Sequence, residues 1–284
     1  MKNKKIGFIG QGWIGKNYAD DFEKRGFKVV RYSLEDEHNG NKEAIAECDI
    51  VFIAVPTPTT PKGFDDSIIK SVMPLIGIGK IAVLKSTLLP GTTQKIQKEN
   101  PKIFVFHSPE FLTEATAEFD AANPTRNIVG IPTDNKEYKK KAQEVIEVLP
   151  KAPFNLICLS TEAEFVKYGG NCWFYFKVIF VNMLYDLAGK SEVNWETVRD
   201  AMSADPRIGR SHLDPVHKSG RGAGGNCFIK DFEAFSRLYE NMVGDKKGVN
   251  ALNGIRDKNI DLLLATGKDL ELLKGVYGED ILLS

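Results

Sequence analysis

The chain has 284 residues with 38 basic and 38 acidic side chains, so its formal net charge is zero. Hydrophobic residues make up 42% and charged residues 27%, ordinary values for a globular protein, and the length suggests two domains of about 100–200 residues each. A neutral balance argues against nucleic acid or an anionic membrane surface as the partner, because both favour basic proteins.

The first half of the chain alternates short apolar runs with helical stretches. Strands are predicted at residues 5–9, 28–32, 50–55, 81–84, 103–106, 128–131 and 156–159, and a helix is predicted at 14–24. The run at 50–55 is apolar throughout, which is typical of a strand buried on both faces. Strands that are separated by helices form βαβ units, so we expect a mostly parallel sheet.

The pattern changes near residue 160, where a Ser-Thr pair followed by acidic residues marks the start of a long helix. This helix runs to about residue 189, and its later part is apolar nearly all round, which predicts burial. Further elements are helices at 194–202, from about 231 and from about 249, and a loop at 205–225. We therefore expect two domains, a dinucleotide-binding domain over 1–160 and a helical domain over 161–284.

The N-terminus and the cysteines predict a cytoplasmic protein. The apolar run after the first lysines is too short and too glycine-rich for a secretory signal, and the most apolar stretch, 173–184, is too short to span a bilayer. The four cysteines form no CxxC pair and are scattered at Cys48, Cys158, Cys172 and Cys227. This spacing favours reduced thiols, and we predict no metal site.

A glycine loop at the start of the chain predicts dinucleotide binding. Residues 10–15 read GQGWIG, which fits GxGxxG, and they follow a predicted strand and open a predicted helix, as such a loop requires. The first glycine permits the turn, the second lets a pyrophosphate approach, and the third allows close helix–strand packing. The helix N-terminus adds amide donors. The first domain is therefore predicted to be a Rossmann domain.

The acid that usually follows the second strand of such a domain is missing. Ser33 stands where an Asp or Glu would hold the ribose hydroxyls, and Glu35 and Asp36 lie just beyond and could substitute. Arg31 and Ser33 could instead accommodate a 2′-phosphate. The sequence favours NAD and leaves NADP open.

The segment GGNCFIKD, residues 224–231, is the sharpest chemical feature of the chain. Gly224 and Gly225 open the backbone beside Cys227, so a substrate can approach the thiol. Lys230 supplies a nearby cation, which would favour the nucleophilic thiolate. Taken alone, a buried structural cysteine at a helix start is an equal alternative.

Five further segments occur in the order found in one enzyme family. They are VPTP at 55–58, KSTLLPGT at 85–92, SPEFLTE at 108–114, EFVKYGGN at 164–171 and DPRIGRSH at 205–212. Together with GGNCFIKD, these segments resemble the UDP-glucose/GDP-mannose dehydrogenase family through nearly the whole chain. Two positions depart from the pattern: Ile229 replaces a proline, and Ala223 stands where a phenylalanine is common.

The resemblance implies an α/β fold, in which a Rossmann-type doubly wound parallel sheet is followed by an all-helical domain like that of 6-phosphogluconate dehydrogenase. It implies two oxidations of the primary alcohol of a nucleotide sugar to a carboxylate, with Cys227 forming a thiohemiacetal and then a thioester. Lys167 and Asn171 lie four residues apart on one helix face and would donate hydrogen bonds to the oxyanion. The residues that would orient water and substrate or move protons are Glu110, Glu114, Thr87 and Asp231.

The resemblance also implies contacts to the cofactor and the substrate. The residues expected to contact NAD are Gly10, Gly12, Trp13, Ile14, Gly15, Ser33, Val55, Pro56, Thr57, Ser86, Thr87 and Lys230. Those expected to contact the substrate are Glu110, Phe111, Leu112, Lys167, Asn171, Arg207, Gly224 and Gly225.

Family members also imply an assembly. They carry a third, nucleotide-binding domain, and this chain stops near residue 283. We therefore expect that domain to be absent and UDP-glucose to bind weakly or with a partner chain. The apolar long helix corresponds to a two-fold interface in the family, which implies a homodimer.

Two other functions stay open. A β-hydroxyacid dehydrogenase has a similar layout, with a Lys and an Asn four residues apart, but its single hydride transfer needs no thiol, so GGNCFIKD argues against it. A non-catalytic dinucleotide-binding module is the other alternative, against which the intact Lys167, Asn171 and Cys227 argue.

Overall fold

The computed structural model describes residues 4–283, and the side chain of Asp36 lies outside the described part. The chain divides into two compact units. The sheet unit comprises the residues up to Thr57 together with Asp65–Lys167, and the helical unit comprises Pro58–Phe64 together with the residues from Tyr168 on. Each unit has its own hydrophobic core.

The sheet unit is built on seven strands in the order β2-β1-β3-β6-β7-β8-β9. These strands are β1 (Lys5–Ile9), β2 (Lys28–Tyr32), β3 (Ile50–Ile53), β6 (Ile81–Leu84), β7 (Phe104–His107), β8 (Arg126–Ile131) and β9 (Phe154–Leu159). All seven lie where the sequence predicts strands, and the mostly parallel sheet is confirmed.

A fully parallel sheet is wrong at one place, because β7 and β8 pair antiparallel through His107 and Gly130. Their connection carries η3 (Glu114–Thr116) and α5 (Ala117–Ala122), and α5 packs on α1 (Trp13–Lys24). A parallel pairing needs a crossover helix that returns the chain to the starting edge of the sheet. This connection does not cross the sheet, so β8 runs back beside β7.

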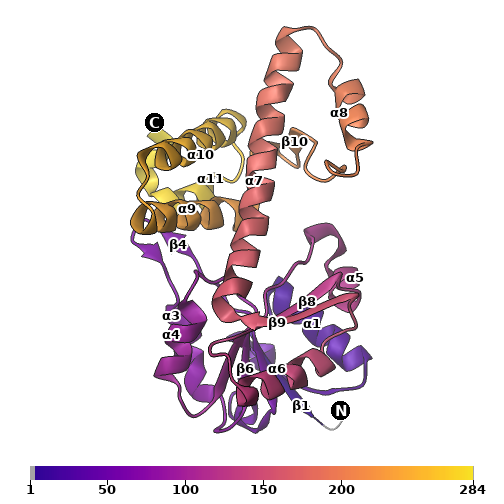
Figure 1. Cartoon of the computed structure of the whole chain (residues 1–284), viewed down its shortest axis with the longest axis vertical. Coiled ribbons are helices and arrows are strands. Elements are labelled where there is room, and N and C mark those ends of the chain that lie inside the picture. The colour runs from indigo at the N-terminus through magenta and orange to yellow at the C-terminus, as the bar shows by residue number, and fades with distance from the viewer. Residues whose placement is uncertain (1–3, 284) are drawn as a thin grey trace. The chain divides into compact units, whose positions relative to one another are not determined.

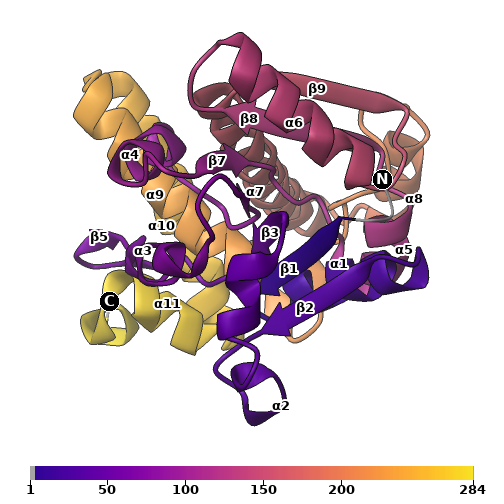
Figure 2. The ribbon, with the colours of Figure 1, turned by 90° about the horizontal axis from the view of Figure 1, so that it is seen from below.

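Helices cover both faces of this sheet. The elements not yet given are α2 (Asp36–Asn39), η1 (Glu43–Glu47), α3 (Ser67–Val72), η2 (Met73–Leu75), α4 (Thr92–Glu99) and α6 (Lys136–Val148). Figure 2 shows α3 and α4 on one side of the strands and α1 and α5 on the other. The core between the sheet and α1 contains Phe8, Phe22 and Phe52, with the rings of Phe8 and Phe52 stacked at 5.1 Å. Each such buried ring contributes about 2–3 kcal/mol of hydrophobic stabilisation.

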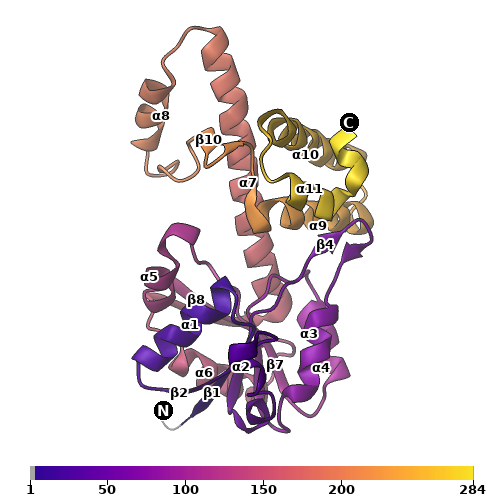
Figure 3. The ribbon, with the colours of Figure 1, turned by 180° about the vertical axis from the view of Figure 1, so that it is seen from behind.

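The helical unit is organised around the long helix α7 (Ser160–Lys190), which enters it at Tyr168. Its other helices are α8 (Trp195–Ser203), α9 (Gly225–Met242), α10 (Lys246–Thr266), α11 (Leu270–Tyr277) and η4 (Glu279–Leu283). Within this unit, α8 lies on one side of α7, and α9, α10 and α11 gather on the other (Figures 1 and 3). No helix among the described residues has both the length and the apolarity needed to cross a bilayer.

The expectation of an all-helical domain is wrong in detail, since two short hairpins belong to this unit. They are β4 (Thr59–Thr60) with β5 (Gly63–Phe64), and β10 (Val216–His217) with β11 (Gly220–Arg221). The first hairpin comes from the first half of the chain and packs on α9 and α11. Arg237 of α9 donates from Nη1 to Thr60 O at 2.7 Å, which fixes that hairpin.

Two features of the helices differ from the sequence expectation. The helix expected from about residue 231 begins at Gly225, because its first amide donates to the carboxylate of Asp269. The sequence predicts that the later part of α7 is buried all round, yet Trp173, Phe180 and Leu187 are 66%, 58% and 62% exposed. One stripe of α7 is therefore apolar and uncovered within the chain.

Candidate functional site

The glycine loop lies at the carboxyl end of β1, where strand order reverses between β2 and β3. Gly10 has φ +89°, and a Cβ on it would lie 2.3 Å from Ala54 O. A Cβ on Gly15 would lie 1.9 Å from Gly10 O, so the helix packs on the loop as closely as expected. Gly12 caps α1 and has open space beside it. The loop can therefore accept a pyrophosphate at the helix N-terminus.

Two more loops contain residues that we expect to contact NAD, and they follow the carboxyl ends of β3 and β6. Hydrogen bonds join the two loops. The Ser86 hydroxyl donates to Val55 O at 2.6 Å and accepts from Val55 N at 3.2 Å. The Thr57 hydroxyl donates to Thr87 O at 2.8 Å. Pro56 lies between the two tied residues of its loop. Because β1 pairs with β3 and β3 with β6, these loops follow the glycine loop along one edge of the sheet.

A cavity of about 640 Å³ lies at the carboxyl end of β2. It is lined by residues of the glycine loop, α1, β2 and the following turn: Gln11, Lys16, Glu23, Val29, Arg31, Glu35, Glu37, His38 and Asn41. Ser33 does not line it; the Ser33 hydroxyl accepts a hydrogen bond from the Glu35 amide at 3.3 Å and so shapes the turn. Glu35 lines the cavity, while the side chain of Asp36 lies outside the described part.

A buried ion pair joins two of the expected catalytic residues in the sheet unit. Lys167 Nζ donates to Glu110 Oε1 and to Glu110 O, each at 2.8 Å, and the two side chains are 6% and 4% exposed. The other carboxylate oxygen, Oε2, accepts from Leu112 N at 2.8 Å. Both oxygens of Glu110 are thus engaged, which fixes the ammonium of Lys167 in place.

The neighbouring residues of the SPEFLTE segment differ from one another in environment. The ring of Phe111 has the guanidinium of Arg126 at 3.8 Å and the ammonium of Lys167 at 5.9 Å from its centroid, so it lies against two cations. Glu114 is exposed at the first residue of η3. The two glutamates of the segment therefore have different surroundings, one buried and one open to water.

Lys85 is a functional candidate that the sequence analysis missed. It is buried, with Nζ 4.3 Å from the centroid of the Tyr18 ring and 3.4 Å from both Ser108 Oγ and Pro109 O. Burial lowers the pKa of Lys85 to about 7, an effect that Glu110 opposes and Lys167 reinforces. The available signal was a lysine directly after the apolar strand at 81–84, a position that is buried in a parallel sheet.

His107 lies in the same region and is wholly buried. Its Nδ1 lies 3.0 Å from Leu84 O. Burial lowers the pKa of His107 to about 3, and the nearby Lys85 and Lys167 lower it further against the raising effect of the Leu84 contact. The imidazole is therefore neutral at physiological pH, and the cations of this region face a neutral ring.

Glu164, also missed, joins α7 to the start of α4. Its Oε2 accepts from Gly91 N at 2.6 Å, and its Oε1 accepts from Thr93 N at 2.8 Å and from the Thr93 hydroxyl at 2.6 Å. The carboxylate is wholly buried and satisfies amides at a helix N-terminus, where negative charge is favourable. Since Lys167 follows one helical turn later, this anchor fixes the direction in which Lys167 points.

In the helical unit, one buried carboxylate holds two expected site residues. Asp231 accepts from Asn171 Nδ2 through Oδ2 and from Lys230 Nζ through Oδ1, each at 2.6 Å. Lys230 is therefore bound by Asp231, although the sequence predicts it as the cation for Cys227. Asn171 lies one turn after Lys167 on α7, so the helix is continuous through both residues, as expected.

Cys227 is exposed and occupies the first turn of α9, so its side chain is not buried as the structural alternative expects. Gly225 before it has φ +78° and donates from N to Asp269 Oδ2 at 2.7 Å. A Cβ on Gly224 would lie 2.0 Å from the same oxygen, so the double glycine lets Asp269 close on the loop. The helix N-terminus beside the thiol stabilises negative charge.

Two other residues of this unit lie in contrasting places. Arg207 has a side chain that is 88% exposed, and its Nη2 donates to Asp205 Oδ2 at 2.6 Å. Ala223 is buried, and its backbone exchanges two hydrogen bonds with the Asn259 amide. The loop before Cys227 is therefore anchored at Ala223, while Arg207 remains accessible.

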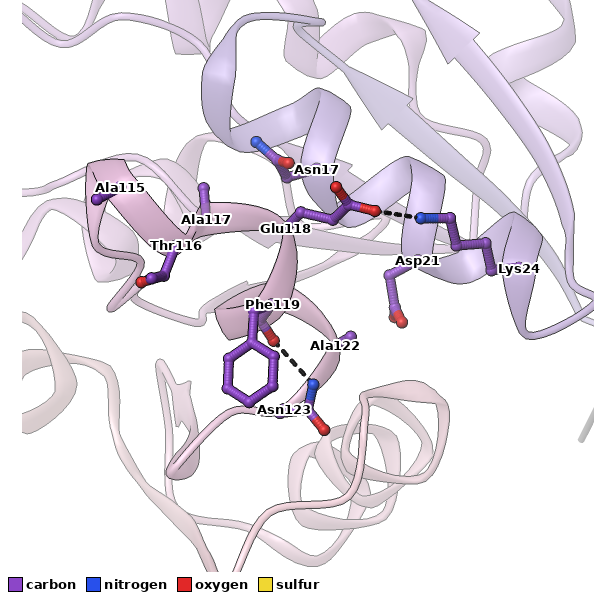
Figure 4. Close-up of a pocket in the computed structure, with 10 residues that line it drawn as sticks. All are labelled: Asn17, Asp21, Lys24, Ala115, Thr116, Ala117, Glu118, Phe119, Ala122 and Asn123. Atoms are coloured by element: carbon purple, nitrogen blue, oxygen red, sulfur yellow. Dashed lines mark hydrogen bonds and ion pairs between the residues drawn. The ribbon is translucent and has the colours of Figure 1, made fainter.

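A second cavity of the sheet unit, about 520 Å³, lies between α1 and the segment of η3 and α5 (Figure 4). Figure 4 shows Lys24 of α1 paired with Glu118 of α5, while the exposed ring of Phe119 lies beside Asn123. None of the expected site residues lines this cavity.

The chain matches two domain models of one family. Residues 33–149 match the NAD binding domain of the UDP-glucose/GDP-mannose dehydrogenase family, and residues 161–259 match its central domain. The match to the NAD binding domain identifies NAD as the cofactor. The UDP-glucose 6-dehydrogenase of Rickettsia prowazekii is 29% identical over 277 residues, covering 91% of this chain and 62% of the relative.

Another curated relative and a solved structure carry the same enzyme name. A UDP-glucose 6-dehydrogenase of Bacillus subtilis is 29% identical over 282 residues, covering 83% of this chain and 59% of its own length. The chain thus spans about three fifths of the length of these curated relatives. The solved UDP-glucose dehydrogenase of Pyrobaculum islandicum superposes with a TM-score of 0.77 at 26% identity, covering 92% of this chain and 70% of that one.

A dehydrogenase with another name shares the fold. The 3-hydroxyisobutyrate dehydrogenase of Mycobacterium tuberculosis superposes with a TM-score of 0.71 at 15% identity, covering 98% of both chains. At that identity the likeness concerns the fold alone.

Proposed function

Because the chain belongs to the UDP-glucose/GDP-mannose dehydrogenase family, we propose that it oxidises the primary alcohol of a nucleotide sugar to a carboxylate in two NAD-dependent steps. The observation that carries the proposal is the exposed Cys227 on the first turn of α9. Oxidation of an alcohol to an aldehyde needs no thiol. Oxidation of the aldehyde does need a nucleophile, because its carbon must become tetrahedral before a second hydride can leave.

In the first oxidation, the substrate carbon loses a hydride and the hydroxyl loses its proton. NAD, when bound, accepts one hydride in each oxidation. The Lys167 ammonium and the Asn171 amide, one turn apart on α7, would donate hydrogen bonds to the oxygen as it becomes an alkoxide. The buried pair with Glu110 holds the Nζ of Lys167 in a fixed orientation. We assign the released proton to a water oriented by Glu110 and Glu114.

In the second oxidation, Cys227 Sγ adds to the aldehyde carbon and forms a thiohemiacetal whose oxyanion receives the same two donors. Loss of a hydride from that carbon leaves a thioester. Water then adds to the thioester and the C–S bond breaks, which releases the carboxylate and restores the thiolate. The balance is one alcohol, two NAD⁺ and one water giving one carboxylate, two NADH and three protons.

The test is to count the NADH formed per molecule of nucleotide sugar and to identify the product by mass spectrometry. We expect two NADH and a carboxylate with UDP-glucose or a related nucleotide sugar. One NADH with a carbonyl product would point to a one-step dehydrogenase instead. Tight dinucleotide binding without turnover on any nucleotide sugar tested would favour a non-catalytic module.

We also propose that the protein is a homodimer joined through α7. Support comes from the apolar stripe of Trp173, Phe180 and Leu187, which are spaced seven residues apart and are 66%, 58% and 62% exposed. Such spacing puts the side chains on one face of the helix, and a contiguous apolar face that is uncovered marks an interaction surface. A second copy of the same face is complementary to it.

Light scattering at micromolar concentration should give a dimer mass for the wild type and a monomer mass for Phe180→Asp. Phe119→Asp is the control, because Phe119 is 65% exposed on α5, outside the stripe, and should leave the mass unchanged. A clean monomer mass for the wild type would contradict the dimer.

A further inference from the structure

Arg31 lies near the carboxyl end of β2, two residues before Ser33, where a nearby arginine can accommodate the 2′-phosphate of NADP in Rossmann enzymes. Its guanidinium is committed to two acids of α1. Nη2 lies 2.7 Å from Asp20 Oδ1 and 2.7 Å from Glu23 Oε2, and Nε donates to Glu23 Oε1 at 3.1 Å. The Arg31 side chain is 14% exposed, so the guanidinium is held within this pair of carboxylates.

The third nitrogen of the Arg31 guanidinium, Nη1, also has a partner. Nη1 donates to Gln11 Oε1 at 3.4 Å, which ties the guanidinium to the glycine loop. Arg31 therefore bridges β2, α1 and the glycine loop. A phosphate that approached this arginine for a bidentate contact would have to displace a carboxylate from Nη2 or Nε, donors that Asp20 and Glu23 already occupy.

The charges that line the cavity at the carboxyl end of β2 also disfavour a phosphate. The cations that line it are Lys16 and Arg31, and the carboxylates are Glu23, Glu35 and Glu37. Asp20 adds a further negative charge through its bond to Arg31. A phosphate monoester carries about 1.5 to 2 negative charges at neutral pH, so it would enter an acidic environment. The two hydroxyls of an unphosphorylated ribose are instead good donors to a carboxylate.

Glu35 is placed to accept those hydroxyls. It follows Ser33 by two residues, is exposed at the N-cap of α2, and lines the cavity. The Ser33 hydroxyl bonds the Glu35 amide, so the serine supports the turn that carries the acid.

We propose that Asp20 and Glu23 are specificity-determining residues, which withhold Arg31 from the adenosine ribose and so make the chain select NAD against NADP. Glu35 replaces the acid that is missing at Ser33. The discrimination is thus divided between a carboxylate that receives the ribose and two carboxylates that neutralise the only arginine lining the cavity. The inference concerns dinucleotide binding alone and holds whether or not a sugar is oxidised.

The test is fluorescence titration of the full chain with NADH and with NADPH. The wild type should bind NADH about a hundredfold more tightly or better, which corresponds to two charge-assisted contacts. The double variant Asp20→Asn/Glu23→Gln releases Arg31 and should gain about tenfold or more in NADPH affinity, with NADH affinity changed by less than about threefold. Glu35→Gln should weaken NADH about five- to tenfold without weakening NADPH.

The matched control is Glu47→Gln, which removes an exposed carboxylate of the same unit that pairs with Lys5, and it should leave the ratio of the two affinities unchanged. If the double variant does not fold, as judged by circular dichroism, Glu23→Gln alone carries the same expectation, since the Glu23 side chain is 48% exposed. Equal affinities of the wild type for NADH and NADPH would overturn the inference. A folded Asp20→Asn/Glu23→Gln variant whose NADPH affinity stays at the wild-type value would overturn the inference as well.

Discussion

The two units place their site residues in opposite environments. In the sheet unit, Lys85, Glu110, Glu164 and Lys167 are buried, and all four have hydrogen-bond partners in the structure. In the helical unit, Cys227 and Arg207 are exposed. Its buried charged site residue is Asp231, which anchors Asn171 and Lys230.

The difference follows from what each group has to do. Donors that stabilise an oxyanion act best when they are fixed in advance and shielded from water, so they are built into a bonded, buried array. A nucleophile must be reached by its electrophile, and the thiol of Cys227, to which we assign that role, lies on an exposed helix turn. Replacing a buried site residue of the sheet unit should therefore change both the stability and the reaction rate, whereas replacing Cys227 should change the rate alone.

The sharpest test of this comparison is Cys227→Ala. We expect formation of the carboxylate to fall on the order of 10³-fold or more, while slow reversible oxidation to the aldehyde survives, because only the second oxidation needs the thiol. Stability should stay within about 0.5 kcal/mol of the wild type, since the side chain is exposed. The measurements are NADH per substrate and urea unfolding. A variant that still produces two NADH at the wild-type rate would make the cysteine structural.

Lys167→Met should change stability and rate together. Removing the ammonium leaves Glu110 as an uncompensated buried charge, which should lower the free energy of unfolding by about 3–5 kcal/mol. Loss of the oxyanion donor should slow both oxidations by about 10²–10³-fold. Urea unfolding and single-turnover rates for each step measure the two effects.

The double variant Lys167→Met/Glu110→Gln is the control for this coupling. It should recover much of the stability, because the remaining side chain is uncharged, but none of the rate. If Lys167→Met alone is as stable as the wild type, the ion pair of Lys167 and Glu110 is not buried in solution.

The positions of the strands along the chain were largely predictable because each strand is short, apolar and bounded by turn residues. The β1 and β2 ranges match the predicted ones. The start of α9 was not predictable, since it depends on Asp269, which lies 44 residues from Gly225 along the chain. Local signals cannot report a partner so distant in sequence.

The same limit applies to the site. The resemblance of the motifs to the dehydrogenase family singled out Lys167, Asn171 and Cys227 as expected site residues, whereas residue type and spacing alone left each of them open. Neither signal identified Lys85 or Glu164, because only packing reveals that a lysine and a glutamate are buried with specific partners. Arg31 was open to either role from sequence, and its two carboxylate partners come from the neighbouring helix.

Lys85→Met tests whether burial of charge in the sheet unit costs stability. The pKa of Lys85 is about 7 in the folded chain against 10.5 for an ordinary lysine. Between these values the unfolded chain binds a proton that the folded chain lacks, so wild-type stability rises with pH through this window. The groups that face the ammonium are Glu110, Lys167 and the Tyr18 ring.

Replacing Lys85 with methionine removes that dependence. At pH 7 the variant should therefore be more stable than the wild type, by about 3–5 kcal/mol at most, and the gap should shrink toward pH 10. Urea unfolding at pH 7 and pH 9.5 measures it, with Lys98→Met, an exposed lysine of α4, as the control. A gap that stays constant with pH would show that the lysine remains charged when folded.

Arg207→Ala carries the smallest expected effect and tests the exposed side of the comparison. The Arg207 side chain is 88% exposed, and its ion pair with Asp205 lies in water, where such pairs contribute little. Stability should therefore change by less than about 0.5 kcal/mol.

The family resemblance implies that Arg207 contacts the substrate. If it does, Arg207→Ala should raise KM a few fold and leave kcat unchanged, because a contact made equally in the ground and transition states affects binding only. Asp205→Asn is the matched control: it frees the arginine without removing it, so KM should stay constant or fall. An unchanged KM in Arg207→Ala would exclude the arginine from the substrate site. A fall in kcat would place it among the groups that act on the transition state, beside Lys167, Asn171 and Cys227.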